Sequence, residues 1–335
     1  MSPLVRWLGP VPDWASAVTL LVIAALLPAL VSTEYVLLGM SMVVTMLLGL
    51  SFNLLFGYAG MFSFGQAAFY GLGAYVTVLL LNDGVDFYPA MLAGVGAAVL
   101  VALVSGVLLV RLEPIAFIML TFALADLFEF IAGHARGLTD GDSGTIANLP
   151  DSLNIIVGVN SVYYAILAVA TVALVLTFAF VKAGAGLVLR GIREDALRAR
   201  TLGIAVDRRR LGVFMLSAAV AGLAGGLSVL SAQIVYPSVF AWQVSASALI
   251  VTLLGGVGLF SGPVLGAVLL GLIDFYVGRF TTNTMLVDGI VLLSVVLIAP
   301  RGVGAVGRGG LLAAPATLIR RLYAKAKGAR AGAPG

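Results

Sequence analysis

The chain has 335 residues, of which 61% are hydrophobic and only 10% are charged. A soluble domain is nearer to roughly 45–50% apolar and about 25% charged, so this composition excludes a soluble enzyme or a disordered tail and requires lipid to cover part of the apolar surface. Cysteine is absent, which excludes disulfides and thiolate sites, and His134 is the single histidine, which disfavours a metal centre. The net charge is +4, and a membrane surface is a better partner for it than nucleic acid.

Long apolar stretches follow one another along the chain. A membrane helix needs about 20 mostly apolar residues to cross the hydrocarbon core. Such stretches predict full membrane spans at residues 15–31, 35–56, 59–81, 88–110, 114–132, 161–181, 211–232 and 286–299. The apolar stretch 244–277 is interrupted by four glycines and Pro263, so we expect two short or broken helices that meet there. The predicted fold class is an all-α, polytopic membrane protein with eight to ten helices.

The placement of charge orients these spans. Fifteen of the 19 basic residues lie in two segments, 182–210 and 301–330, and the positive-inside rule places both in the cytoplasm. The loop 133–160 carries Asp140, Asp142 and Asp151, and we expect it on the outer face. Counting the spans between these segments puts both termini in the cytoplasm, with residues 301–335 as a basic tail. The first span is expected to stay uncleaved, because its flank lacks the positive region of a signal peptide. Residues 1–335 then form a single transmembrane domain.

A weak internal repeat has the pattern G-x-x-G-x-F-S. It occurs at residues 57–63 and again at residues 255–261, each time between apolar helices. Transporters often place glycine-interrupted segments at corresponding positions of two halves, where they line the central pathway. The alternative is close helix packing through small residues. The repeat favours a pathway role without excluding the alternative.

The cytoplasmic segment contains a predicted short amphipathic helix at residues 190–204. Its apolar stripe consists of Leu189, Ile192, Ala196, Ala199 and Leu202 with Gly203, and charged residues occupy the remaining face. Such a helix, held between two spans, is able to dock in the groove of a cytoplasmic partner. A solvated or membrane-surface loop whose arginines only set the topology is the other interpretation.

Several of these segments carry a family resemblance, in order and spacing along nearly the full chain. They are residues 50–75, which include the first glycine motif, residues 190–204 and 217–225, residues 236–243, 254–258 and 262–266, and residues 299–302. The chain resembles the LivM-type permease of branched-chain amino-acid ABC transporters, a family that also includes urea and short-amide permeases. The resemblance implies a LivH-type sister permease or second copy, two cytoplasmic ABC ATPases that bind ATP and Mg, a periplasmic substrate-binding protein and a location in the inner membrane.

The resemblance also assigns roles to residues. It implies that residues 183–210, here called the coupling segment, contact the ATPases through Arg193, Glu194, Asp195, Ala196 and Gly203. The chain has no phosphate-binding loop of the G-x-x-x-x-G-K-[ST] type, so ATP hydrolysis is expected on another subunit. This chain is expected to bind no cofactor or metal and to catalyse no reaction. Gln66 and Asp126 differ from the residues common in relatives, which leaves the substrate open.

Polar groups inside the spans and the glycine motifs are the candidates for the substrate pathway. They are Asn53, Gly57, Gly60, Ser63, Gln66, Asp126, Glu129, Gly255, Gly256, Gly258 and Pro263. A structural alternative pairs Asp126 or Glu129 with Arg136. Two other classes stay open: a self-sufficient secondary transporter or channel with Asp126 and Glu129 as a proton relay, and an intramembrane enzyme, which lacks a nucleophile–base pair.

Overall fold

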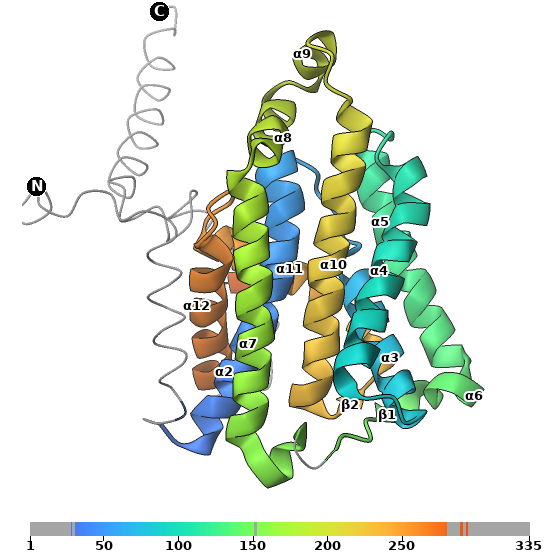
Figure 1. Ribbon diagram of the computed structural model, residues 1–335, viewed down its shortest axis with the longest axis vertical. Helices are drawn as coiled ribbons and strands as arrows, with labels where there is room; N and C mark the ends of the chain where they lie inside the picture. Colours follow the sequence, from blue (N-terminus) through green and yellow to red (C-terminus); the bar gives the residue numbers. More distant parts are fainter. Residues whose placement is uncertain (1–27, 29–30, 151–152, 280–288, 291–292, 294–335) are drawn as a thin grey trace, which may run out of the picture.

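The computed structural model describes residue 28 and residues 31–150, 153–279, 289–290 and 293 (Figure 1). The predicted spans at 15–31 and 286–299 lie almost wholly outside these residues, and the basic tail 301–335 lies wholly outside them. The described part is almost entirely helical, as predicted. Five of its helical stretches are long and apolar enough to cross a membrane: Thr33–Ala59, Phe87–Leu109, Pro114–His134, Gly158–Lys182 and Val206–Ala232. The protein is therefore a multi-pass membrane protein.

The long helices follow the predicted spans closely. They are α2 (Thr33–Phe52) with the π-helix η2 (Asn53–Ala59), α3 (Gln66–Asn82), α4 (Phe87–Leu109), α5 (Pro114–His134), α7 (Ile155–Lys182) and α10 (Val206–Ala232). The predicted start of a span at residue 59 is wrong. Gly60 has a left-handed backbone with φ of 70° and stops the preceding helix, and regular helix resumes only at Gln66.

The predicted broken pair is confirmed at the glycines. It consists of α11 (Trp242–Gly255) and α12 (Gly262–Val277). Gly256 and Gly258 have φ of 114° and 76°, which L side chains rarely adopt, and Pro263 occupies the first turn of α12. We call residues 53–65 the first glycine break and residues 255–262 the second glycine break.

Glycines allow the central helices to approach closely. An added Cβ on Gly73 of α3 would overlap the carbonyl oxygen of Gly222 on α10, and one on Gly225 would overlap the carbonyl oxygen of Tyr70. Helices α2, α3 and α10 form the buried centre, while α4, α5 and α7 keep large apolar faces exposed. This arrangement is typical of a membrane bundle, in which small residues pack the centre and apolar side chains face outward.

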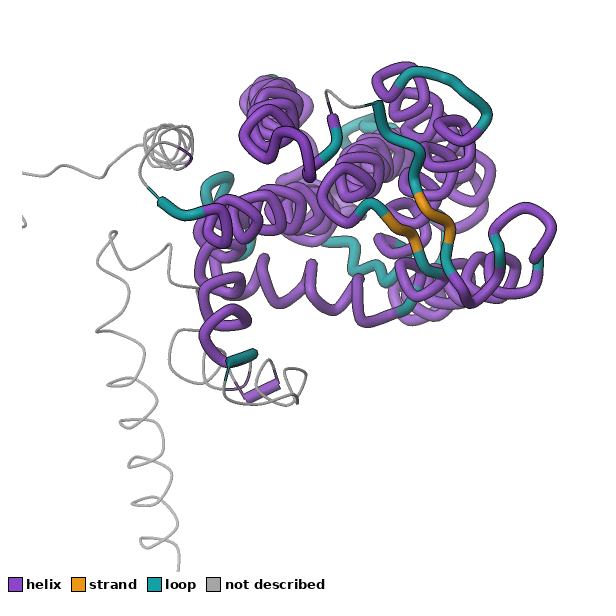
Figure 2. The backbone as a smooth tube through the Cα atoms, turned by 90° about the horizontal axis from the view of Figure 1, so that it is seen from below, coloured by secondary structure: helices purple, strands orange, loops and turns teal. Residues whose placement is uncertain are grey.

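The two ends of the bundle carry different structures. At one end lie α6 (Arg136–Thr139), η3 (Gly141–Ser143) and η5 (Pro237–Phe240), together with the strand pair β1 (Thr145–Ile146) and β2 (Ile234–Val235), which is antiparallel (Figures 1 and 2). At the opposite end lie α8 (Gly184–Glu194) and α9 (Ala196–Thr201). The acidic loop 133–160 and the coupling segment are thus at opposite ends, as their charges predict.

Candidate functional site

The two glycine breaks touch each other through one buried amide. Asn53 donates its Nδ2 to the carbonyl oxygen of Leu259 at 2.9 Å and accepts the backbone N–H of Gly258 on its Oδ1, also at 2.9 Å. The backbones approach so closely that an added Cβ on Gly57 would lie 2.8 Å from the Gly258 nitrogen. The structure thus brings together three of the predicted pathway residues, Asn53, Gly57 and Gly258, from segments about 200 residues apart in sequence.

Side chains from distant helices hold the first glycine break. Phe64 donates its N–H to Thr121 Oγ1 of α5 at 3.2 Å, and its carbonyl oxygen accepts from Ser245 Oγ of α11 at 2.6 Å. The buried Ser63 accepts the N–H of Gly65 on its Oγ at 3.0 Å. Because this stretch lacks helical hydrogen bonds, these side chains satisfy backbone groups that would otherwise be buried without partners.

The aromatic rings of the first break also pack on one another. Phe62 lies 5.5 Å from Phe52, 5.4 Å from Phe56 and 5.3 Å from Phe64, measured between ring centroids. Phe64 in turn contacts Phe122 of α5. Through this cluster the first glycine break packs against α5.

The second glycine break is held mainly by its own backbone. An added Cβ on Gly255 would overlap the carbonyl oxygen of Gly262, so the ends of α11 and α12 are in backbone contact. Leu259 donates its N–H to the carbonyl oxygen of Gly256 at 3.3 Å, and Gly262 donates to Leu259 at 3.2 Å. Phe260 packs on Phe178 of α7, with ring centroids 5.0 Å apart.

Arg193 connects the coupling segment to both breaks. Its Nη1 donates to the carbonyl oxygen of Gly57, and its side chain covers Gly60, where an added Cβ would lie 2.8 Å from Arg193 Cγ. An added Cβ on Gly258 would lie 3.3 Å from the same Nη1. One guanidinium group therefore binds the first glycine motif and lies beside the second at the point where the two motifs meet.

The coupling segment contains two helices, so the prediction of one helix over 190–204 is wrong. The chain leaves helical geometry at Asp195, with φ of −154°. The Asp195 carboxylate then caps α9 by accepting the N–H of Arg198 at 2.9 Å. Glu194 and Ala196 flank this interruption, and Gly203, with φ of 79°, follows the end of α9. Aspartate is a good cap and a poor interior residue, which explains the break.

The predicted apolar stripe is split between two environments. Leu189, Ile192 and Ala199 are buried against the chain itself, so they are not available to a partner. Leu202 is 74% exposed, and Leu197, which the stripe did not include, is 73% exposed. The surface on which a partner is able to dock therefore differs from the predicted one.

Gln66 directly follows the first glycine break and lies in a closed network that does not include the second. Its Nε2 donates to Ser217 Oγ at 3.1 Å, and its Oε1 accepts from Ser51 Oγ at 3.2 Å. Ser217 Oγ donates to the carbonyl oxygen of Ser51 at 2.7 Å. The side chain is 0% exposed, so the amide joins α2, α3 and α10 and faces no passage in this conformation.

Asp126 and Glu129 lie on the outward side of α5. Asp126 is exposed and Glu129 is half-buried. Neither forms an ion pair within the part of the chain that the structure describes, and the pairing with Arg136 considered from the sequence is not observed there. Their neighbours on this side are apolar and strongly exposed: Ile115, Met119, Leu127 and Phe130.

The comparisons with known proteins agree with this architecture. Residues 33–299 match the model of the family described as branched-chain amino acid transport system / permease component. The chain belongs to this family of permeases. It is 27% identical to the high-affinity branched-chain amino acid transport system permease protein LivM of Salmonella typhimurium over 84% of this chain and 73% of that protein, and 27% identical to LivM of Escherichia coli over 85% and 73%. No solved structure matches the chain.

A third relative of the permease adds a weaker match. The probable ABC transporter permease protein y4mJ of Sinorhizobium fredii is 29% identical over 68% of this chain and 70% of its own length. The three relatives each align over more than two thirds of their length, so the likeness extends well beyond any one motif.

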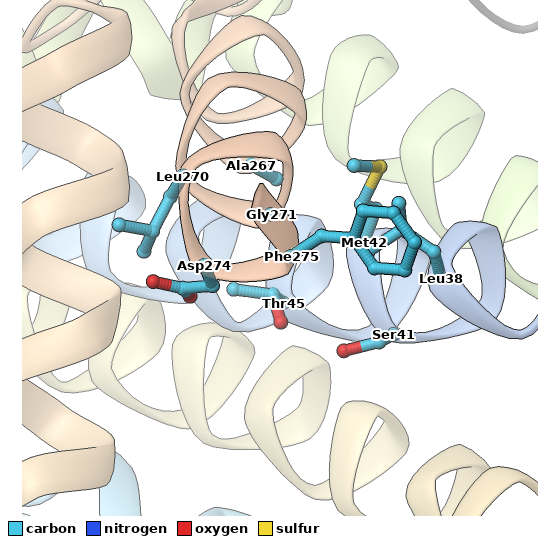
Figure 3. A pocket seen from close by; sticks show the side chains of 9 residues that line it. All are labelled: Leu38, Ser41, Met42, Thr45, Ala267, Leu270, Gly271, Asp274 and Phe275. Carbon is cyan, nitrogen blue, oxygen red and sulfur yellow. The ribbon is translucent and has the colours of Figure 1, made fainter. Parts of the chain in front are cut away.

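The described part of the permease has a cavity away from the glycine breaks. A space of about 280 Å³ lies between α2 and α12, and Figure 3 shows Ser41, Thr45 and Asp274 on its wall with Met42 and Phe275. The predicted pathway residues do not line it.

The sequence analysis missed Leu197 as an exposed apolar residue. Helical spacing over residues 190–204 was unable to identify it, because α9 is a separate helix.

Proposed function

We propose that this chain is the membrane-spanning permease subunit of an ATP-driven ABC importer for branched-chain or related small amino acids. Support comes from the family membership and from the names of the LivM relatives. The urea and short-amide permeases share this scaffold and are the alternative substrate class. The chain itself performs no covalent chemistry in this proposal, and ATP and Mg bind to separate ATPase subunits.

The coupling segment is proposed to face the cytoplasm and to receive the ATPases. Exposed Leu197 and Leu202 offer apolar side chains at the end of the bundle, next to the charged residues Arg198 and Glu194. An exposed apolar group in a charged rim is the usual composition of a protein interface. The termini and the basic tail are proposed to lie on the same side, and a periplasmic binding protein to deliver substrate at the opposite end.

The observation that carries the mechanism is the contact of Arg193 with both glycine breaks. A movement of the coupling segment must displace this guanidinium group, and the group touches the junction of residues 57–60 with Gly258. The breaks interrupt helices within the membrane domain, which is where transporters place their pathway. We propose that ATPase movement opens and closes the pathway through this contact, and that the first glycine break is its moving part, while the second break with Pro263 stays fixed.

The outward face of α5 is proposed to contact the second permease across the pathway. A carboxylate at the bilayer centre costs roughly 2.5–3.5 kcal/mol on insertion scales unless it is wetted or paired. Asp126 is exposed in this chain, and a partner subunit or a water-filled passage supplies the polar surroundings that lipid does not. Gln66 is not part of this proposal, because its amide is enclosed.

The test is ATP-dependent uptake by purified subunits in liposomes. The chain, its sister permease and the ATPases are reconstituted with the binding protein, and leucine, urea and acetamide are compared as substrates. Uptake that requires both ATP and the ATPases supports the proposal. Uptake by the chain alone, driven by a proton gradient and lost in Asp126→Asn, would instead establish the secondary transporter.

A further inference from the structure

A small cavity lies at the elbow where α7 ends and α8 begins. Its volume is about 180 Å³. Its wall includes Phe178 and Lys182 of α7, Leu187 and Arg190 of α8, and Tyr58 and Phe260. The last two residues belong to the first and second glycine breaks, so the cavity adjoins both of them.

The two cations of this elbow face aromatic rings and no carboxylate. Lys182 Nζ lies 5.5 Å from the ring centroid of Phe178, and the Arg190 guanidinium lies 5.1 Å from that of Tyr58. Neither cation takes part in an ion pair within the described ranges. An aromatic face attracts a cation but accepts few of its N–H groups. Both cations thus retain donors for an anion.

Some other basic side chains of the permease form ion pairs. Arg200 contacts Asp207 at 2.9 Å, and Arg279 contacts Glu34 at 3.4 Å. The elbow therefore differs from these sites in combining two cations, a cavity and no neighbouring acid in its lining.

The position of the cavity restricts the anion. Lys182 is the last residue of a helix long and apolar enough to span the membrane, so the elbow lies at the level where acyl chains meet headgroups. Leu187 is 76% exposed although its helix buries Leu189 and Ile192 on the opposite side. The site thus presents cations to one part of a ligand and apolar side chains to another.

We propose that this elbow binds the phosphate headgroup of an anionic phospholipid, with Lys182 and Arg190 on the phosphate and Leu187 and Phe178 on the acyl chains. Basic pockets between membrane helices on the cytoplasmic side are suited to such headgroups. A free phosphate is also an anion but has no chain to contact Leu187. The bound lipid lies against Tyr58 and Phe260 and stabilises the arrangement of the breaks seen here.

The test measures lipid binding to the purified full chain by native mass spectrometry, independently of transport. Phosphatidylglycerol and phosphatidylcholine are titrated against the wild type and against Lys182→Gln/Arg190→Gln. Each basic residue near an anionic headgroup contributes about fivefold in affinity, so the double variant is expected to bind phosphatidylglycerol about 25-fold more weakly. Phosphatidylcholine binding is expected to stay unchanged.

The matched control is Arg208→Gln/Arg209→Gln, which removes the same charge from exposed positions at the same end of the bundle. This control is expected to bind phosphatidylglycerol like the wild type, and an equal loss in both variants would overturn the site. Lys182→Arg/Arg190→Lys is expected to retain binding, which separates loss of charge from misfolding.

A last experiment tests whether the bound phosphate belongs to a lipid or to a free ion. Leu187→Ser is expected to weaken phosphatidylglycerol binding, because it removes the contact with the acyl chain. Inorganic phosphate is expected not to displace the lipid. Displacement by inorganic phosphate, together with unchanged lipid binding in Leu187→Ser, would assign the elbow to a soluble anion and overturn the proposal.

Discussion

The two glycine breaks share the pattern G-x-x-G-x-F-S, yet different contacts hold them. The first is a π-helix followed by an irregular stretch, and Thr121, Arg193 and Ser245 from three distant helices hold its backbone. The second is a tight turn in which Gly255 and Gly262 are in backbone contact. We therefore expect that a movement of the coupling segment reshapes the first break, and that the second break stays fixed.

Asn53 and Arg193 are the side chains at which the two breaks meet. Asn53 belongs to the first break and forms both of its hydrogen bonds with the second. Arg193 comes from the coupling segment and touches both. The comparison implies that substitutions in the second break damage folding, whereas substitutions at the junction damage transport as well.

The largest effect is expected from Gly255→Ala. The added Cβ overlaps the Gly262 carbonyl oxygen, and a backbone group is unable to rotate away as a side chain does. We expect a loss of about 3 kcal/mol in the free energy of unfolding, seen as low yield of monodisperse protein and a lower Tm. The control is Gly96→Ala in α4, where an added Cβ meets nothing within 4 Å. Similar yields for both variants would contradict a rigid second break.

A smaller effect is expected from Asn53→Leu. It leaves the Gly258 N–H without its partner, at a cost of about 1–3 kcal/mol, whereas the Leu259 carbonyl oxygen keeps the N–H of Gly262. Transport per folded molecule is also expected to fall, because the junction between the breaks is lost.

Gln66→Leu is the matched comparison for Asn53→Leu, because both amides are 0% exposed. It is expected to lower the Tm by a similar amount and to leave uptake per folded molecule unchanged, since the Gln66 network does not touch the second break. Loss of transport in Gln66→Leu at normal stability would show that Gln66 is part of the substrate pathway.

The smallest effect is expected from Gly191→Ala in α8, between Arg190 and Arg193. An added Cβ at this position meets nothing within 4 Å, and alanine favours a helix over glycine by about 0.5–1 kcal/mol. We expect a slight rise in Tm with normal uptake. A fall in uptake would show that α8 must bend during transport. The coupling segment, and not the first break alone, would then change conformation during transport.

The sequence was sufficient for the features that depend on local composition. Hydropathy predicted the starts of the helices at Phe87 and Pro114 to within a residue, because apolar length decides a membrane span. The clustered glycines likewise predicted the break between α11 and α12.

The sequence was not sufficient for features that depend on tertiary contact. The junction joins Arg193 to Gly57 across 136 positions, and no local pattern indicates that approach. The interruption at Asp195 was missed because the apolar spacing continues through it while the carboxylate caps a new helix. The enclosure of Gln66 follows from Ser217, which lies 151 positions away.

The most direct test of the central claim is the ratio of substrate transported to ATP hydrolysed by the reconstituted transporter carrying Arg193→Gln. The substitution removes the guanidinium group that contacts both breaks while leaving Leu197 and Leu202 for the ATPases. We predict that uptake falls about tenfold, within the usual range of coupling free energies, while ATP hydrolysis is retained. An unchanged ratio would contradict the proposal that Arg193 transmits movement from the coupling segment to the glycine breaks.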